Sequence, residues 1–226
     1  MTSASLGTFF WLSAVYFYMK YSMNISPYVD ALFLMVVIIF MYFINVSIMQ
    51  TKCSSANSIV FKATFLPWVF IFGSMVLALS MFPQWKNPFS NTFGYLVARL
   101  AGGTSSLLDL LKPGSETSLH YVYNNPSLLI NQFTPLNFDT VLQSLQNELA
   151  VTEDKKEAFR KIVKLKDVIS EWIWYLLTAS VVISTSYTMM MNAECTKSPD
   201  EYVLSHNIAM AETTEEEPVT MYTVTE

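Results

Sequence analysis

Three segments of the chain, residues 31–49, 63–82 and 172–191, run for 19 or 20 residues without a charged side chain. A helix of about 20 mostly apolar residues crosses the hydrocarbon core of a bilayer, so each segment is long enough to span it. Only 14% of all residues are charged and 52% are hydrophobic, whereas a soluble domain carries about 25% charged residues. So few charges cannot cover three apolar helices in water. The pattern predicts a mainly α, polytopic α-helical membrane protein.

A fourth apolar segment, residues 4–19, is shorter than the other three. Its 16 residues fall just below the usual length of a span, so a short span, an interfacial helix or a cleaved signal peptide could account for it. A signal peptide is disfavoured because no basic residue precedes Leu6 and no small-x-small pattern follows the apolar run. We expect four transmembrane helices, alternatively three. Residues 1–82 then form an N-terminal membrane region, and four spans place both termini on one side.

Basic residues near the ends of the spans indicate the orientation, because cytoplasmic loops carry an excess of Lys and Arg. Lys20, Lys86 and the four bases of residues 160–166 flank the spans on the side of the long loop, residues 83–171. The opposite side has fewer bases, namely Lys52, Lys62 and Lys197. The balance predicts a cytoplasmic long loop.

The long loop has 89 residues, enough for a small exposed or interfacial domain. Between Phe93 and Leu111 the apolar residues recur at helical spacing, with an interruption at Gly102-Gly103. This pattern predicts a helix that lies in the membrane interface or packs across the ends of the spans.

The rest of the loop is less regular. Residues 115–138 contain Tyr121-Val122-Tyr123 and two X-Pro pairs, which predict an extended stretch with one or two short strands. Asp139 is expected to cap a helix that continues to Ala150. The exposed loop domain is therefore expected to be mixed rather than purely helical.

Aromatic rings and prolines gather where the long loop meets the spans. Trp and Tyr are enriched at membrane–water interfaces because their rings are amphipathic. The predicted membrane-interface residues are Phe82, Pro83, Trp85, Pro88, Phe89, Phe93, Tyr95, Trp172 and Trp174.

The end of the loop, residues 153–171, is basic and amphipathic, and Thr152 can cap it. Nothing breaks this helix before Trp172, so it is expected to continue into the last span. Its bases could contact anionic lipid head groups, at roughly 1 kcal/mol per base. A solvated face that carries its own acids is the alternative. The candidate bases are Lys155, Lys156, Arg160, Lys161, Lys164 and Lys166.

The tail, residues 192–226, holds one base and eight acids, so its net charge is −7. The other 191 residues hold 12 bases and 10 acids, a net charge of +2. The acidity of the chain therefore belongs to an extended C-terminal tail of a composition typical of disorder. Its end could add as a strand to the sheet edge of a partner, through Val219, Met221, Tyr222 and Val224.

Residue types that carry catalysis are scarce. His120 and His206 fall on opposite predicted sides of the membrane, and no spacing typical of a metalloprotease, a zinc site, a nucleophile elbow or a phosphate loop occurs. No predicted span contains an ionisable side chain other than tyrosine, which disfavours a pump or coupled transporter. We expect no enzyme, no cofactor, no metal site, no small-molecule substrate and no nucleic-acid partner.

Small and sulfur-containing residues give two weaker signals. Ser180, Ser184 and Thr188 recur every four residues and predict a face on which helices pack closely, rather than a pore lining.

Cys53 and Cys195 each lie four residues beyond a span and could form a disulfide on the non-cytoplasmic side, although two unpaired cysteines fit the sequence as well.

Several short motifs resemble a known group of proteins. The motifs are residues 82–85 (FPQW) and 88–95 (PFSNTFGY), with WLS at 11–13, YFY at 16–18, NISP at 24–27, LPW at 66–68 and IFG at 71–73. In these residues the chain resembles the multi-span membrane proteins of nucleocytoplasmic large DNA viruses. The similarity covers about residues 9–101, and residues from 115 onward match no pattern of that group.

The resemblance implies a component of the inner membrane of a virion, beneath an icosahedral capsid. It leads to the expectation of a structural membrane protein that anchors or shapes this membrane and links it to capsid proteins. The expected partners are the lipid bilayer and other viral membrane and capsid proteins, and host-cell membranes would hold the protein during assembly. A membrane channel or an entry or fusion component is the alternative.

Overall fold

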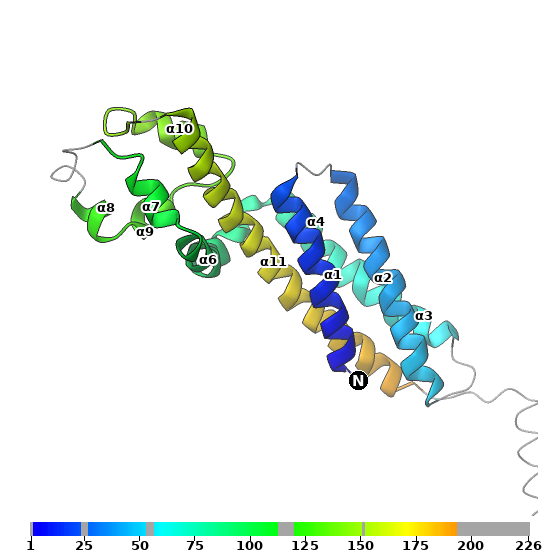
Figure 1. Ribbon diagram of the computed structural model, residues 1–226. Coiled ribbons are helices and arrows are strands. Elements are labelled where there is room, and N and C mark those ends of the chain that lie inside the picture. Colours follow the sequence, from blue (N-terminus) through cyan, green and yellow to red (C-terminus); the bar gives the residue numbers. More distant parts are fainter. Residues whose placement is uncertain (1, 24–26, 53–56, 113–119, 151, 194–226) are drawn as a thin grey trace, which may run out of the picture.

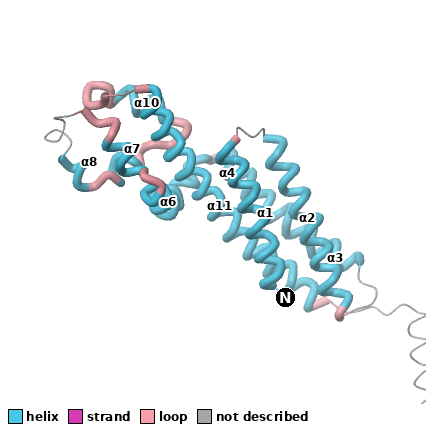
Figure 2. Tube along the Cα trace, viewed as in Figure 1, coloured by secondary structure: helices cyan, strands magenta, loops and turns pink. Residues whose placement is uncertain are grey.

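The computed structural model describes residues 2–23, 27–52, 57–112, 120–150 and 152–193, and the regular elements found there are all helical (Figure 2). In chain order they are α1 (Thr2–Ser22), α2 (Pro27–Gln50), α3 (Asn57–Pro67), η1 (Trp68–Phe72), α4 (Gly73–Met81), η2 (Pro83–Lys86), α5 (Asn87–Phe89), η3 (Ser90–Gly94), α6 (Tyr95–Leu100), α7 (Gly103–Leu108), α8 (His120–Asn124), α9 (Ser127–Ile130), α10 (Phe138–Ser144) and α11 (Glu153–Met191). Within these residues the only β pairing is an isolated antiparallel bridge between Leu111 and Leu149.

A bundle of antiparallel helices forms one part of the molecule (Figure 1). It consists of α1, α2, the rod α3–η1–α4, and residues 167–191 of α11. α1 contacts α2 and α11, α2 contacts α3, and both α3 and η1 contact α11, so the ring of neighbours is closed. The chain direction alternates around this ring, and the beginning of α1 lies at the same end as the end of α11 (Figure 1).

Three helices of the described chain are long and apolar enough to cross a membrane: Tyr28–Gln50, Asn57–Met81 and Glu153–Met191. They contain the expected spans 31–49 and 172–191 and all but the last residue of the span 63–82. α1 has 21 residues and is not among these helices. By length and composition the structure therefore supports three spans, with α1 as a further helix of the same bundle.

The rod α3–η1–α4 contains a π-helical turn directly after Pro67. Proline has no N–H to donate to the α-helical ladder, and a single π turn allows the chain to remain helical past it. The N–H of Gly73 donates to the carbonyl of Trp68 across this turn. The wider turn lies where Trp68 and Phe72 are buried in the bundle core.

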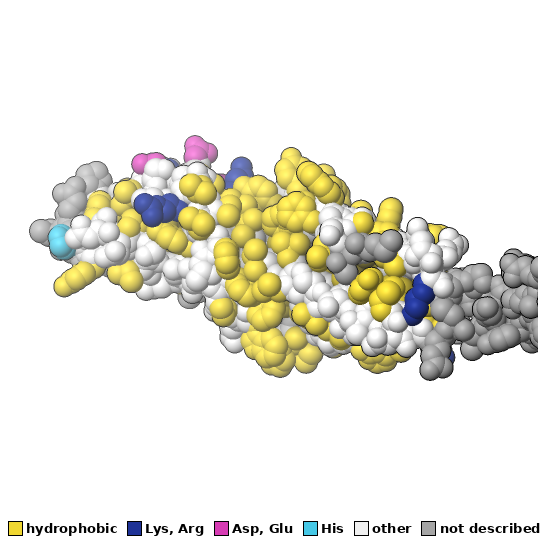
Figure 3. Space-filling view, turned by 90° about the horizontal axis from the view of Figure 1, so that it is seen from below, with side chains coloured by type: hydrophobic (Ala, Val, Ile, Leu, Met, Phe, Trp, Pro, Cys, Tyr) yellow, Lys and Arg dark blue, Asp and Glu magenta, His cyan; other side chains and the backbone are white. Residues whose placement is uncertain are grey.

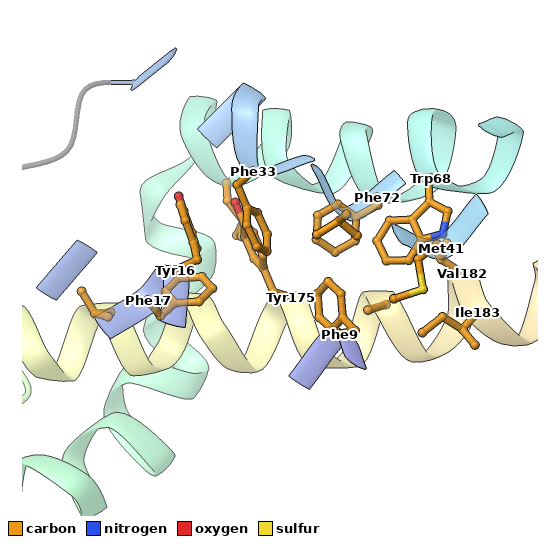
Figure 4. Close-up of a cluster of buried hydrophobic side chains, with 14 residues drawn as sticks. Phe9, Tyr16, Phe17, Phe33, Met41, Trp68, Phe72, Tyr175, Val182 and Ile183 are labelled. Atoms are coloured by element: carbon orange, nitrogen blue, oxygen red, sulfur yellow. The ribbon is translucent and has the colours of Figure 1, made fainter. Parts of the chain in front are cut away.

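Aromatic rings fill the centre of the bundle (Figure 4). Tyr16 stacks on Phe33 with 4.2 Å between ring centroids, and Phe72 meets Tyr175 edge-on at 5.0 Å. These rings come from α1, α2, η1 and α11, so the cluster joins every wall of the bundle. Aromatic pairs of this kind contribute about 0.5–1.5 kcal/mol beyond the area they bury.

A second, smaller core lies beyond the bundle in a part that we call the head, which comprises α7 to α10 and residues 153–166 of α11 (Figure 1). Phe133, Phe138 and Phe159 pack together at its centre, with 5.0 Å between the rings of Phe133 and Phe159. Ala98 at the end of the preceding helix α6 also belongs to this core. The long loop is thus a folded unit with its own hydrophobic centre.

Two local predictions for the head are wrong. Tyr121, Val122 and Tyr123 lie in the short helix α8 and not in a strand, since the described residues place no second strand beside them. Asp139 does not cap α10, because the helix begins at Phe138 after Asn137 and ends at Ser144, short of Ala150. The amide of Asn137 closes the turn before α10 instead, since its Oδ1 accepts a hydrogen bond from the N–H of Thr134 at 2.7 Å.

α11 joins the two parts as one continuous helix of 39 residues. Thr152 occupies the expected N-cap position, but its side chain makes no capping hydrogen bond. At about 1.5 Å per residue α11 is about 58 Å long, whereas a bilayer core is about 30 Å thick. Phe159 and Val163 of this helix lie in the head core, and Val168 and Tyr175 lie in the bundle core. The prediction that the basic helix continues into the last apolar segment is confirmed.

Candidate functional site: the junction between bundle and head

Charged side chains meet where the bundle ends and the head begins. Lys20 of α1 lies 2.6 Å from the carboxylate of Glu171 of α11, and Lys86 of η2 lies 2.5 Å from Asp167. Lys86 also lies 3.6 Å from Glu171, and Lys20 lies 3.8 Å from Asp30 of α2. Four separate elements are thus joined by one ion-pair network.

The network is partly withdrawn from water, since the side chains of its members are between 11% and 33% exposed. Glu171 is buried, and its carboxylate lies between the ammonium groups of Lys20 and Lys86. The hydroxyl of Tyr16 donates to Asp30, so the aromatic core of the bundle is connected to the network. Removing one partner of a buried ion pair typically costs about 3–5 kcal/mol, and the partly exposed members of this network contribute less because solvent screens them.

A cavity of about 620 Å³ lies beside the network. The charged wall is formed by Lys20, Lys86, Asp30, Asp167 and Glu171. The rest comes from α4, η2, Asn87, Tyr175 and residues 134–137 of the head. Among the described residues, no three His, Cys, Asp or Glu side chains gather as they would around a metal ion. The ion pairs are suited to holding α1, α2, η2 and α11 together.

Tryptophans at the start of the last apolar segment attach neighbouring elements to α11. The indole N–H of Trp174 donates to the carbonyl of Trp85 at 2.9 Å, and its ring meets Phe89 edge-on at 5.1 Å. The indole N–H of Trp172 donates to the hydroxyl of Ser13 on α1 at 2.9 Å. The structure therefore brings the predicted interface residues Trp85, Phe89 and Trp174 into contact at one level of the molecule.

The other predicted interface residues lie along the segment that follows α4. Phe82 stacks on Trp85 with 5.7 Å between centroids, and Phe93 is exposed. Pro83 is the first residue of η2, and Pro88 lies in α5. Tyr95 has a different environment, since it is half-buried against the head core.

The basic residues of α11 have partners within the protein. Lys155 donates to the carbonyl of Asp109 at 2.7 Å and Lys164 to that of Met23 at 3.3 Å, while Lys156 and Arg160 pair with Asp139 at 3.4 and 2.8 Å. Arg160 and Lys156 also lower the pKa of the Asp139 carboxyl from its ordinary value. Lys161 is exposed.

Lys166 cannot be the lipid head-group contact that the sequence suggests. Its side chain is buried, and its ammonium group donates to the carbonyl of Ile130 in the head at 3.0 Å. This part of α11 lies outside the apolar segment 172–191. Burial lowers the pKa of Lys166 to about 8. Within the head, the residue links α9 to α11.

The bundle contains a buried polar cluster that the sequence does not predict. The side-chain amide of Asn45 donates to the hydroxyl of Thr64 at 2.8 Å and to that of Ser186 at 3.0 Å, and all three side chains are buried. The cluster connects α2, α3 and α11. The sequence shows Asn45 as an isolated polar residue in an apolar segment, and its partners lie too far away in sequence to be recognised.

The small residues predicted to form a packing face on the last span lie on the outside. Ser180, Ser184 and Thr188 are exposed, and the hydroxyls of Ser180 and Thr188 donate to carbonyls four residues earlier in the same helix. The buried face of this helix carries Ala179, Val182 and Ser186 instead. Thus the prediction of a packing face at Ser180, Ser184 and Thr188 is wrong for contacts within this chain.

Two candidate sites lie outside the described residues. They are the possible disulfide between Cys53 and Cys195, and the possible partner-binding tail with Val219, Met221, Tyr222 and Val224. Both remain predictions from the sequence.

Comparisons of the chain with protein families, with curated proteins and with solved structures found no match. The fold and the junction together define a class of architecture: an apolar helical bundle that carries a small helical head on one continuous helix.

Proposed function

We propose that the protein is a structural membrane protein whose bundle lies in a bilayer and whose head is held at a fixed position above the membrane surface. The head then serves as an attachment point for a layer of protein. The observation that carries this proposal is the continuity of α11, which belongs to both hydrophobic cores without a break.

The outer surface of the bundle supports its placement in a bilayer. Along α2, Leu32, Met35, Ile39 and Phe43 recur every three or four residues, and all are exposed. Soluble proteins rarely expose contiguous apolar surface of this extent, whereas lipid tails would cover it. Three helices of sufficient length and apolar character agree with this environment.

The junction supports a rigid attachment of the head. Glu171 and Asp167 of α11 pair with Lys20 and Lys86 at the end of the bundle, and Lys166 on the same helix holds Ile130 of α9 against α11. A hinge at this level would have to break several of these contacts together. A partner bound to the head would therefore be held at a fixed distance from the membrane.

The resemblance of residues 9–101 to giant-virus membrane proteins supplies the proposed location, the inner membrane of a virion beneath its capsid. In that setting the head would contact capsid proteins. The bundle interior is filled with aromatic rings, and the buried amide of Asn45 donates to the hydroxyls of Thr64 and Ser186. These features favour a link over a channel.

Photo-crosslinking tests the proposed link. A photoreactive amino acid replaces Leu136 or Tyr121, which are 79% and 77% exposed on the head, or Ile39 on the outside of the bundle as a control. In purified virions we expect the head positions to cross-link to a capsid-layer protein and Ile39 to cross-link to lipid. Absence of the protein from the virions, or cross-links of both head positions to lipid alone, would exclude the link.

A further inference from the structure

The segment from Pro83 to Leu100, which we call the arm, has one side packed on α11 and one exposed apolar side. The proposed link to capsid proteins gives the exposed side no role. It consists of η2, α5, η3 and α6, which follow one another without a described break. In Figure 1 α6 is seen along its axis, whereas the helices of the bundle lie in the plane of the picture. The end of the arm therefore runs across the bundle axis, at the level of the junction.

The inner side of the arm is fixed to α11 by small residues. Ser90, Gly94 and Ala98 recur every four residues, and all three are buried. A Cβ atom on Gly94 would lie only 2.4 Å from the carbonyl oxygen of Lys166, so glycine is required for this close approach. The packing determines which side of the arm faces outward.

The outer side of the arm is apolar. Phe93, Leu96 and Leu100 are 51%, 54% and 80% exposed, and Phe82 and Trp85 continue the same row toward α4. Phe89, between Trp85 and Phe93, is only half-exposed, because its ring also meets Trp174 of α11 edge-on. Figure 3 shows hydrophobic side chains gathered in a band across the middle of the molecule, between bundle and head.

We propose that this outer side is inserted into one leaflet of the bilayer, so that the arm acts as a wedge on the side of the head. This inference depends on the proposed placement of the bundle in the membrane. The arm starts two residues after the end of α4 at Met81, whose side chain is exposed on the bundle surface, so the apolar surface of the bundle continues into the arm.

The residues of the arm favour contact with one lipid leaflet. Its outer row contains no charged residue. The row starts at the level of Trp174, which bonds to the carbonyl of Trp85, and its far end lies beside Lys166, next to the ion-pair network. Lys86 is turned into that network, and Arg99 at the far end is exposed beside Leu100, where it can reach head groups. Amphipathic helices with these features insert about 5–10 Å into the boundary between head groups and acyl chains.

Insertion on one side only has a mechanical consequence. Material added at the head-group level of one leaflet spreads that leaflet relative to the other, and amphipathic helices are accordingly sensitive to curvature. The protein is therefore expected to favour membranes that are convex toward the head. The inner membrane beneath a closed capsid is convex toward the capsid. A preference for convex membranes would therefore favour the protein at that location.

Spin labels measure the insertion directly. In a background with Cys53→Ser and Cys195→Ser, single cysteines at Phe93, Leu96 or Leu100 carry a nitroxide in protein reconstituted into phosphatidylcholine vesicles. We expect collisions with oxygen to exceed those with a water-soluble nickel complex, at a shallower depth than for bundle labels at Leu77 and Val181. Labels at Tyr121 and Leu136 on the head are expected to favour the nickel complex.

The outcomes separate the two proposals. Arm labels in water with bundle labels in lipid would overturn the wedge alone, whereas bundle labels in water would overturn the membrane placement as well. In a second measurement, protein in giant vesicles is compared between the flat surface and a pulled tube whose outer leaflet faces the head. Wild type should be enriched in the tube, and F93S/L96S should lose this enrichment while L77S keeps it. Equal ratios for wild type and F93S/L96S would exclude the wedge.

Discussion

At the scale of single residues, Lys166 is the ionisable group whose environment differs most from water outside the apolar segments. Its native pKa of about 8 lies below the ordinary value of 10.5 because burial disfavours the ammonium form. Between these two values the unfolded chain binds more protons than the native protein, so stability must rise with pH. The full difference corresponds to an energy on the order of 3 kcal/mol.

The Lys166→Met variant isolates this effect. In detergent, the melting temperature of the wild type relative to that of Lys166→Met is expected to rise between pH 8 and pH 10, because the other titrating groups cancel in the comparison. Differential scanning fluorimetry at several pH values provides the measurement. A difference that stays constant or falls over this range would show that Lys166 is not held in the buried position beside Ile130.

Asn45 is the second residue whose role can be measured alone. Asn45→Leu removes both hydrogen bonds that connect α2 with Thr64 and Ser186. The two hydroxyls left behind can turn to carbonyls of their own helices, so we expect a loss of only about 1 kcal/mol. Reversible unfolding in mixed micelles measures the loss. Ser184→Ala on the exposed side of α11 serves as the control, and an equal loss for both variants would contradict a connecting role.

Sequence reasoning identified these residue types but not their partners. Asn45 was visible as a polar residue in an apolar segment, yet the hydroxyls it meets lie 19 and 141 residues away. For Lys166 the sequence suggests a lipid contact or a solvated position, because its neighbours in sequence are basic. Its burial depends on Ile130, which belongs to a loop whose fold no local pattern predicts.

At the scale of elements, apolar length predicted the long helices well, and periodicity failed where elements are short. A segment such as α8 has five residues, so its helix depends on packing rather than on propensity. A repeat of small residues did mark the close helix contact, but at Ser90, Gly94 and Ala98 rather than at Ser180, Ser184 and Thr188. The sequence alone does not show which of these two repeats packs against another helix and which lies on the outside of the bundle.

Gly94→Ala tests the contact between the arm and α11. The added methyl group would meet the carbonyl of Lys166, a backbone atom that cannot move aside cheaply, so we expect a destabilisation of about 1–3 kcal/mol. The melting temperature in detergent reports it. Gly7→Ala in α1 is the matched control, since a Cβ there meets no atom within 4 Å and should leave the stability equal or slightly higher. A melting temperature of Gly94→Ala equal to that of Gly7→Ala would contradict the close approach.

At the scale of the whole molecule, the position of the head relative to the bundle depends on α11. Spin labels at Tyr121 in the head and Leu77 in the bundle are expected to show a narrow distance distribution by pulsed EPR in vesicles. Val168→Pro removes a helical hydrogen bond at the junction and costs about 3 kcal/mol or more, so it should broaden the distribution. Val168→Ala keeps the helix and should leave it narrow. A broad distribution in the wild type would exclude a rigid link.

The topology of the bundle leads to a final prediction. Lys52, which follows α2, donates to the carbonyls of Met191 and Ala193 at 2.5 and 3.0 Å, so the end of α2 and the end of α11 lie at one end of the molecule. His120 lies in the head at the other end (Figure 1).

If the bundle spans a bilayer, single cysteines at positions 53 and 206 should react with an impermeant maleimide from one side of sealed vesicles, and a cysteine at position 120 from the other. Ser3→Cys then decides between four spans and three, since it shares the side of position 53 only if α1 also crosses. Reaction of positions 53 and 120 from the same side would rule out a spanning rod α3–η1–α4.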